Sequence, residues 1–238
     1  MKDLSGKWWL GLAAAILCFA PSSLADTSIV LTGAGNNPVD GVYVGPYQGT
    51  VNGVANTQVI CDDFGDESYV PESWSATSTV DAGLPAASPV NFFAVDGQQG
   101  YSAVASLAEQ LFALSPSDPN YDTKAADLQY AIWYVFDKSG VTSFLSGDST
   151  LLNAASADAA AALGGSYTPG EFSNIEILTP DTTQPISCNG GPCANTPPQE
   201  FIVQTPEPGT FAMLGIGLLM VGLLARRKYS VASSVASA

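Results

Sequence analysis

Short stretches in which apolar and polar residues alternate follow one another through the first half of the chain. From Ser28 to about Val95 the sequence is rich in Val, Thr, Tyr and Phe, with turn-forming residues at 33–37, 45–46 and 52–53. β-Branched and aromatic residues between Gly, Pro and Asn are typical of short antiparallel strands. This half of the chain is therefore expected to be mostly β-structure.

Apolar residues recur at helical spacing in the next part of the chain. Ser102 can cap the first helix, and the Pro-containing segment 115–119 ends it. Ser139-Gly140 closes the second helix, and Gly164-Gly165 stops the third, which is rich in Ala. The pattern thus predicts helices over residues 102–114, 122–138 and 149–163.

Strand signals return after the third helical segment, at Phe172–Leu178 and Glu200–Val203, on either side of a loop rich in Pro, Gly, Asn and Thr. Strands before and after a block of helices are the arrangement of an α+β fold. We expect an antiparallel β-rich domain with an insertion of two to three helices.

Both ends of the chain carry an apolar run. Near the N-terminus, Lys2 and Lys7 precede an apolar stretch from Trp8 to Ala20, and small residues occupy Ser23 and Ala25. This order predicts a signal peptide that is cleaved after Ala25.

The second apolar run lies near the C-terminus, from Phe211 to Ala225. Its fifteen residues make a helix of about 22 Å, which is short for a bilayer core of about 30 Å. Pro206-Glu207-Pro208 precedes the run, and Arg226-Arg227-Lys228 follows it. Because basic clusters stay on the cytoplasmic side, we expect a C-terminal transmembrane helix with everything before it outside.

The order of Pro-Glu-Pro, apolar helix and Arg pair resembles the PEP-CTERM sorting signal of Gram-negative bacteria. In that family an exosortase, a membrane-embedded cysteine protease or transpeptidase, recognises the tail. Its members are linked to exopolysaccharide, biofilm or the cell surface. The resemblance implies export, anchoring in the membrane, and release to the surface or outside. The chain would then divide into a signal peptide (1–25), an extracellular domain (26–205), a sorting signal (206–228) and a short cytoplasmic tail (229–238).

The charge of residues 26–205 excludes some classes of function. The chain has 22 acidic and seven basic residues, and only Lys124 and Lys138 of the basic ones lie between residues 26 and 205. Because 20 of the acidic residues lie there, this part has a formal charge of −18, which argues against nucleic-acid binding. The chain has no histidine, so Ser-His-Asp and Cys-His catalysis are excluded. No cofactor is expected, and the protein is not expected to be an enzyme.

Gln129 is out of place in its helix. At spacings of three and four residues it shares a face with Ala125, Ile132, Trp133 and Phe136, which are apolar. A buried amide without partners costs about 1 to 3 kcal/mol. Another part of the chain is therefore expected to pair with it.

Two motifs, Val59-Ile60-Cys61-Asp62-Asp63-Phe64 and Leu128-Gln129-Tyr130-Ala131-Ile132-Trp133, resemble those of thioester domains in surface adhesins of Gram-positive bacteria. In those domains a Cys and a Gln join covalently, and an amine on a partner captures the acyl group. The resemblance implies that Cys61 and Gln129 form the bond and that Trp133 packs over it as a shield. Leu128 stands where many members have Thr.

The number of cysteines does not decide whether Cys61 and Gln129 form a thioester. Cys18 lies in the leader, and Cys188 and Cys193 enclose a short loop, so a disulfide between them is the natural expectation in an oxidising compartment. Cys61 is then unpaired. It can equally be a buried thiol of structural use, or form a disulfide with one of the other two, with Gln129 bonded only to backbone.

The acidic residues select no site by their spacing. Asp62, Asp63, Asp66 and Glu67 do not fit an EF-hand loop, so a solvated acidic turn without metal is expected. No pair of carboxylates stands out for glycoside hydrolysis.

Three functions remain. The first is a non-enzymatic surface or matrix protein that binds an amine-bearing partner or exopolysaccharide, through a thioester if one forms. The second is a structural or carbohydrate-associated module, with Tyr47, Trp74 and Phe92 as possible contacts. The third is a secreted hydrolase that uses Asp or Glu.

Overall fold

The computed structural model describes residues 26–35, 37–80, 92–93, 95, 97–183, 186–188, 197–205 and 215–220. The expected α+β fold is found, with the helices between the sixth and seventh strands. The strands are β1 (Asp26–Gly33), β2 (Pro38–Val39), β3 (Val42–Tyr43), β4 (Tyr47–Val51), β5 (Val54–Cys61), β6 (Glu72–Val80), β7 (Ile175–Pro180), β8 (Ser187–Cys188) and β9 (Phe201–Gln204). The helices are α2 (Gly97–Phe112), α3 (Tyr121–Phe136), α4 (Lys138–Phe144), the 3-10 turn η3 (Leu145–Gly147) and α5 (Ser149–Leu163).

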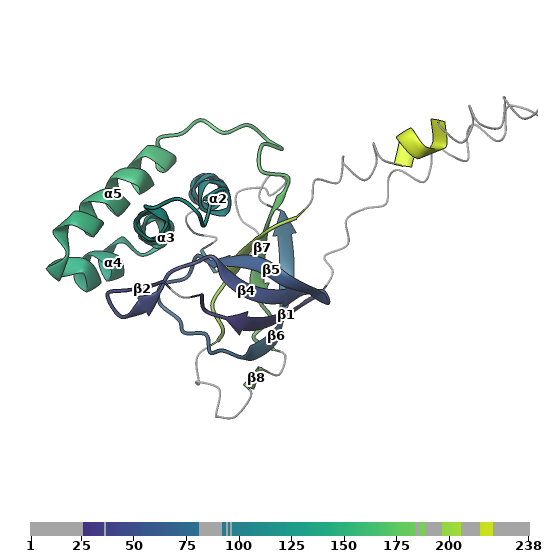
Figure 1. Cartoon of the computed structure of the whole chain (residues 1–238), viewed down its shortest axis with the longest axis horizontal. Helices are drawn as coiled ribbons and strands as arrows, with labels where there is room; N and C mark the ends of the chain where they lie inside the picture. Colours follow the sequence, from purple (N-terminus) through teal and green to yellow (C-terminus); the bar gives the residue numbers. More distant parts are fainter. Residues whose placement is uncertain are drawn as a thin grey trace, which may run out of the picture.

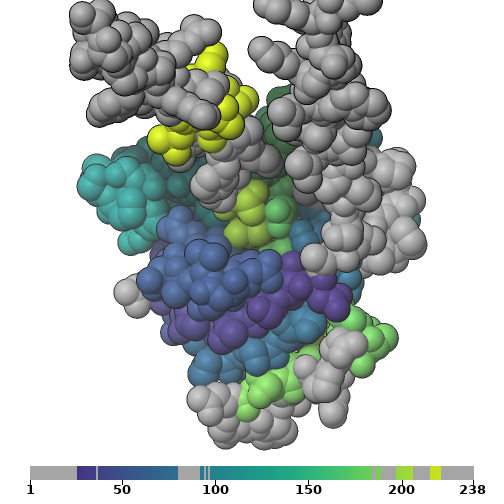
Figure 2. All heavy atoms as spheres, turned by 90° about the vertical axis from the view of Figure 1, so that its right-hand side faces the viewer, coloured from purple at the N-terminus to yellow at the C-terminus, as the bar shows by residue number. Residues whose placement is uncertain are grey.

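Seven strands form one antiparallel sheet, in the order β1-β4-β5-β9-β7-β6-β8. β1 also pairs with β6, so six of these strands close into a ring and β8 extends it beside β6. Figure 2 shows β4, β1 and β6 side by side across one face. Closure brings the late strand β9 next to β5, which ends at Cys61.

The local sequence explains the early strands. Thr27, Ile29 and Leu31 point inward along β1, while the residues between them are more exposed, as a period of two requires. Asn52 and Gly53 both have positive φ, 50° and 79°, and join β4 to β5 as the sequence predicted. Two such residues suit the type I′ turn, whose twist matches that of the strands.

The helices gather on one side of the sheet (Figure 1). α3 is the central helix: α2, α5 and α4 pack against it, and it reaches β5. Its buried residues therefore occupy most of its circumference, and they are Ala125, Ala126, Leu128, Gln129, Tyr130, Ala131, Ile132 and Trp133.

The first helix starts earlier than predicted. Ser102 lies inside α2 and is buried, because the helix begins at Gly97. The side chain of Gln99 donates hydrogen bonds to the carbonyl oxygens of Leu163 and Gly165. The first turn of α2 is thus anchored by the end of α5, a contact between segments far apart in the sequence.

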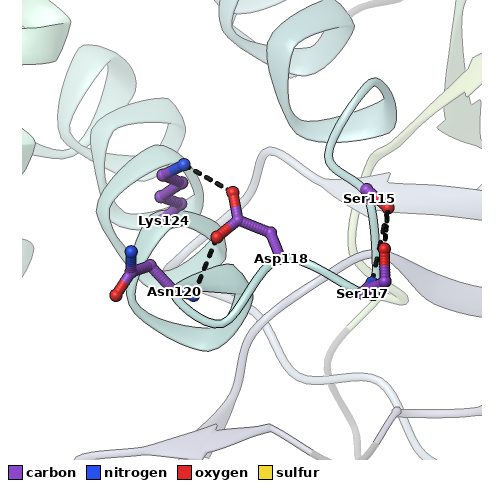
Figure 3. Close-up of polar contacts among 5 residues, drawn as sticks. All are labelled: Ser115, Ser117, Asp118, Asn120 and Lys124. Atoms are coloured by element: carbon purple, nitrogen blue, oxygen red, sulfur yellow. Dashed lines mark hydrogen bonds and ion pairs between the residues drawn. The ribbon is translucent and has the colours of Figure 1, made fainter.

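The segment between α2 and α3 contains Pro116 and Pro119, and it ends α2 as predicted. Within it Asp118 accepts a hydrogen bond from the backbone N–H of Asn120 at 2.8 Å and pairs with Lys124 at 2.6 Å (Figure 3). Asp118 thereby fixes the start of α3.

The predicted end of the second helix is also corrected. α3 stops at Phe136, and Asp137 then caps the short α4 by accepting the backbone N–H of Gly140 at 2.8 Å. Ser139 and Gly140 thus lie inside α4 and do not close α3. The third predicted helix has the bounds of α5, and the two late strands, β7 and β9, begin later than predicted, at Ile175 and Phe201.

Residues 1–25 lie outside the described residues, as does most of the apolar run 211–225. Residues 215–220 are helical. Among the residues that the structure describes, no helix has the length and apolar character needed to cross a membrane.

Candidate functional site

Gln129 is fully buried in α3, and both ends of its amide are paired. Its Oε1 accepts the backbone N–H of Gly45 at 3.1 Å, and its Nε2 donates to the carbonyl oxygen of Cys61 at 2.7 Å. The partners expected for this amide therefore come from the segment before β4 and from the end of β5. The structure brings Cys61 and Gln129 together from positions 68 residues apart.

Gly45 approaches the amide so closely that no other residue fits in this geometry. A Cβ at this position would lie 2.6 Å from Gln129 Oε1 and 3.4 Å from the ring of Tyr47. Real Cβ atoms essentially never come within 3.0 Å of another heavy atom. The backbone N–H can reach the amide oxygen because residue 45 has no side chain.

Cys61 is a free, fully buried thiol at the end of β5. Its Sγ–H donates to the carbonyl oxygen of Asp63 at 3.0 Å. Burial raises the pKa of the thiol well above its usual value, and the nearby Asp63 and Asp62 raise it further. The thiol is therefore protonated at rest.

Trp133 lies four residues after Gln129 in α3. Its side chain is buried, and its ring centroid lies 5.0 Å from that of Tyr130 and 5.2 Å from that of Phe64. Phe144 of α4 packs edge-on against Phe64 at 5.5 Å. Trp133 thus belongs to an aromatic cluster on the helix that carries Gln129, and its role as a shield stays a prediction.

A cavity of about 470 Å³ lies over these aromatic rings. Tyr47, Trp133, Phe201 and Gln199 line its inner side, and each is tied to the pair or its neighbours. Gln199 donates to Asp63 O, the acceptor of the Cys61 thiol, at 2.8 Å. Phe201 is the register partner of Cys61. Gln199 and Phe201 thus connect the lining of the cavity to the neighbours of Cys61.

Asp62 and Glu200 form a buried pair of carboxyl groups that the sequence did not predict. Both are 0% exposed, and their backbones meet where Asp62 N–H donates to Glu200 O at 3.3 Å. Glu200 also accepts hydrogen bonds from Tyr101 Oη at 2.7 Å, from Phe92 N–H at 3.2 Å and from Thr179 Oγ1. The expectation of a solvated acidic turn was wrong for Asp62 and for Asp63, which is 4% exposed.

These carboxyl groups hold protons more tightly than free ones. Burial raises the pKa of Asp62 and that of Glu200, and it raises the pKa of Asp63 to about 6. Within the described residues no donor group reaches the carboxyl oxygens of Asp62, so a proton on Asp62, directed at Glu200, satisfies both groups. Asp62 and Glu200 are brought together only by the pairing of β5 with β9, which no local sequence pattern predicts.

The remaining predicted site residues lie only partly within the described residues. Cys188 is disulfide-bonded, but the predicted partner, Cys193, lies outside the described residues. Tyr47 and Trp74, named as possible carbohydrate contacts, are buried at 8% and 4% exposure. Among the described residues, no three Cys, Asp or Glu side chains are grouped so that they could hold a metal ion.

The comparison with protein families gives one finding. Residues 204–228 match the family model of the PEP-CTERM protein-sorting motif. The predicted sorting signal is thereby confirmed, with Pro206, Glu207, Pro208, Arg226 and Arg227 inside the matched segment. The motif marks an exported protein that an exosortase processes. No curated protein and no solved structure matches the chain.

Proposed function

We propose that this protein is a non-enzymatic surface or extracellular-matrix component in which Cys61 and Gln129 form an internal thioester that captures an amine of a partner. The observation that carries the proposal is the buried amide of Gln129, held at its oxygen by Gly45 N–H and at its nitrogen by Cys61 O. Because Gly45 has no side chain, its backbone N–H reaches the amide oxygen. That is the atom on which negative charge builds when a nucleophile attacks the amide carbon.

The first step joins Cys61 to Gln129. The thiol loses its proton, Sγ attacks Cδ of Gln129, and negative charge builds on Oε1, where Gly45 N–H stabilises it. The C–N bond then breaks, and the thiol proton leaves with the nitrogen as ammonia. The acyl group remains on sulfur as a thioester. The raised pKa of Cys61 makes its thiolate a poorer leaving group, so later attack on the thioester again depends on the contact that stabilises the charge on Oε1.

The second step transfers the acyl group to a partner. A primary amine attacks the same carbon, Sγ leaves and recovers a proton, and an amide bond joins the partner to residue 129. Each chain performs this once, so the protein is consumed and does not turn over. Exclusion of water by Trp133, Tyr130 and Phe64 favours capture over hydrolysis.

Delivery to the surface completes the proposal. The sorting motif at residues 204–228 directs the chain to the exosortase, and the apolar run 211–225 serves as a membrane anchor before processing. Residues 26–205 then face the outside, where exopolysaccharide or amine-bearing surface proteins are the available partners. A thioester would make adhesion covalent.

The competing function is a structural matrix protein in which Gln129 only joins α3 to the sheet. The same two hydrogen bonds favour it, because they satisfy the amide without chemistry. A hydrolase is less well supported. The described carboxyl pair, Asp62 and Glu200, is fully buried and offers a substrate no access.

The test is an intact-mass measurement of the full chain under denaturing, non-reducing conditions. Thioester formation removes one ammonia, about 17 Da. The deficit is expected in the parent, absent from Cys61→Ala and Gln129→Ala, and replaced by an adduct after treatment with methylamine. If the parent mass lacked only the hydrogens lost in disulfide formation, the thioester would be ruled out and the structural function would remain.

A further inference from the structure

Exposed apolar side chains gather at the opening of the cavity over Trp133. Tyr43, Val70 and Phe144 line it and are 51%, 43% and 42% exposed. They come from β3, from the loop after β5 and from α4, so three separate elements place apolar side chains around one opening. Exposed apolar groups gathered at one hollow are typical of a surface that binds another molecule.

The charges at this mouth have a single sign. Asp66 and Glu67 line the cavity, and no Lys or Arg is among its described lining residues. The two lysines of the domain are engaged elsewhere: Lys124 pairs with Asp118, and Lys138 lies over the ring of Tyr134. With a formal charge of −18 between residues 26 and 205, the domain attracts cations to this opening.

The inner side of the cavity leads to the proposed thioester. Tyr47 lies 3.4 Å from a Cβ placed on Gly45, and Gln199 donates to Asp63 O, the acceptor of the Cys61 thiol. Trp133 lies one helical turn after Gln129 in α3. A nucleophile in the cavity therefore meets the rings of Tyr47 and Trp133 on its way to the acyl carbon. The aliphatic stem of a lysine can pass such rings while its ammonium stays near carboxylates.

We propose that this cavity is the entry site for the partner and that it selects a lysine within a basic segment of a protein. The inference rests on the proposed thioester and names the nucleophile. Asp66 and Glu67 hold the flanking positive charges, the exposed apolar side chains contact the backbone and side chains beside the lysine, and the lysine loses a proton before it attacks. A polypeptide is favoured over a free polyamine because a polyamine has nothing to cover Tyr43, Val70 and Phe144.

The experiment measures the rate at which the full chain, in detergent, forms adducts with four nucleophiles. They are an acetylated peptide with a lysine between arginines, the same peptide with glutamates as flanks, spermidine, and hydroxylamine, which is uncharged at neutral pH. The basic peptide is expected to react about tenfold faster than the acidic one and faster than spermidine. This preference should shrink with added salt.

The matched variant is Asp66→Asn with Glu67→Gln. It should slow the basic peptide about fivefold, because two exposed ion pairs are lost, and leave the hydroxylamine rate unchanged. A second variant, Tyr43→Ser, should slow both peptides and spare hydroxylamine.

Three other results would each contradict a part of the proposal. Equal rates for both peptides, with hydroxylamine still reacting, would overturn the cavity's selectivity and leave the thioester standing. Spermidine as fast as the basic peptide would overturn the polypeptide partner. No adduct with hydroxylamine in the parent would remove the thioester and this inference together.

Discussion

The amide nitrogen of Gln129 donates a hydrogen bond to the carbonyl oxygen of Cys61 at 2.7 Å. This bond joins the central helix to the end of β5, and it fixes the amide with its nitrogen toward the cysteine backbone and its oxygen toward Gly45. Both ends of the buried amide are therefore paired, and its carbon is held in one orientation.

Gly45→Ala is expected to prevent or greatly slow loss of ammonia. The new Cβ would lie 2.6 Å from Gln129 Oε1, so the amide must move and lose the N–H contact that stabilises its oxygen. The displaced amide should also cost about 1 to 3 kcal/mol of unfolding free energy. Intact mass after timed refolding and urea denaturation measure the two effects.

The control for this change is Gly147→Ala, since a Cβ on Gly147 has no neighbour within 4 Å. It should keep both the mass deficit and the stability. If Gly45→Ala showed the full deficit at the parent rate, the N–H of Gly45 would have no part in the chemistry.

Trp133→Phe is expected to shorten the lifetime of the thioester. The smaller ring admits water to the acyl carbon, and hydrolysis should accelerate roughly tenfold, equivalent to about 1.4 kcal/mol in the barrier. Hydrolysis leaves a carboxylate at position 129, about 1 Da heavier than the original amide, so a mass time course follows it.

Trp74→Phe is the matched variant for Trp133→Phe. Trp74 is also buried, and it packs on Phe201 at 5.6 Å, but it is not among the residues that line the cavity. It should lower stability without changing the lifetime. Equal acceleration in both variants would mean that loosening of the core, and not loss of a shield, admits water.

The domain is expected to be more stable at mildly acidic than at neutral pH. Burial raises the pKa of Asp63 to about 6 and raises those of Asp62 and Glu200, so the folded state binds protons that the unfolded chain releases near pH 4, the usual value of about 3.9 to 4.3. This stabilisation is complete below the unfolded pKa and is lost as pH rises through the folded one. Tm should fall by several degrees between about pH 5 and about pH 8.

Asp62→Asn tests the source of that pH dependence. The asparagine amide can donate to Glu200 at every pH, so Tm at about pH 8 should rise and the slope should flatten. Asp122→Asn, an exposed residue in the first turn of α3, should leave the slope unchanged. A slope that is the same in Asp62→Asn as in the parent would place the titration elsewhere.

Asp148→Ala is expected to destabilise the domain by about 1 kcal/mol. The Asp148 side chain accepts the backbone N–H groups of Thr150 and Leu151, both at 3.0 Å, at the start of α5. Their loss leaves two donors without a side-chain partner. Ser143→Ala, at an exposed position of α4, is the control, and denaturant unfolding gives both values.

Local patterns succeeded where a segment depends on its own residues. The Asn52-Gly53 turn, the helix over 149–163 and the end of α2 before Pro116 follow from turn, capping and proline chemistry. The start of α2 was missed because Gly97 disfavours a helix, and the contact of Gln99 with the end of α5 holds the first turn in place. The end of α3 was missed because Asp137 caps the next helix.

The sequence by itself determined the sorting signal, since Pro206-Glu207-Pro208, the apolar run and the Arg pair are contiguous and are read as a linear segment. It also determined that Gln129 needed polar partners, because helical spacing puts the amide on an apolar face. Only the tertiary structure decided which groups those partners are. Gly45 and Cys61 reach Gln129, and Asp62 reaches Glu200, because the sheet closes and brings β5 beside β9 and under α3. Pairing between segments so far apart in the chain cannot be predicted from the local sequence of either one.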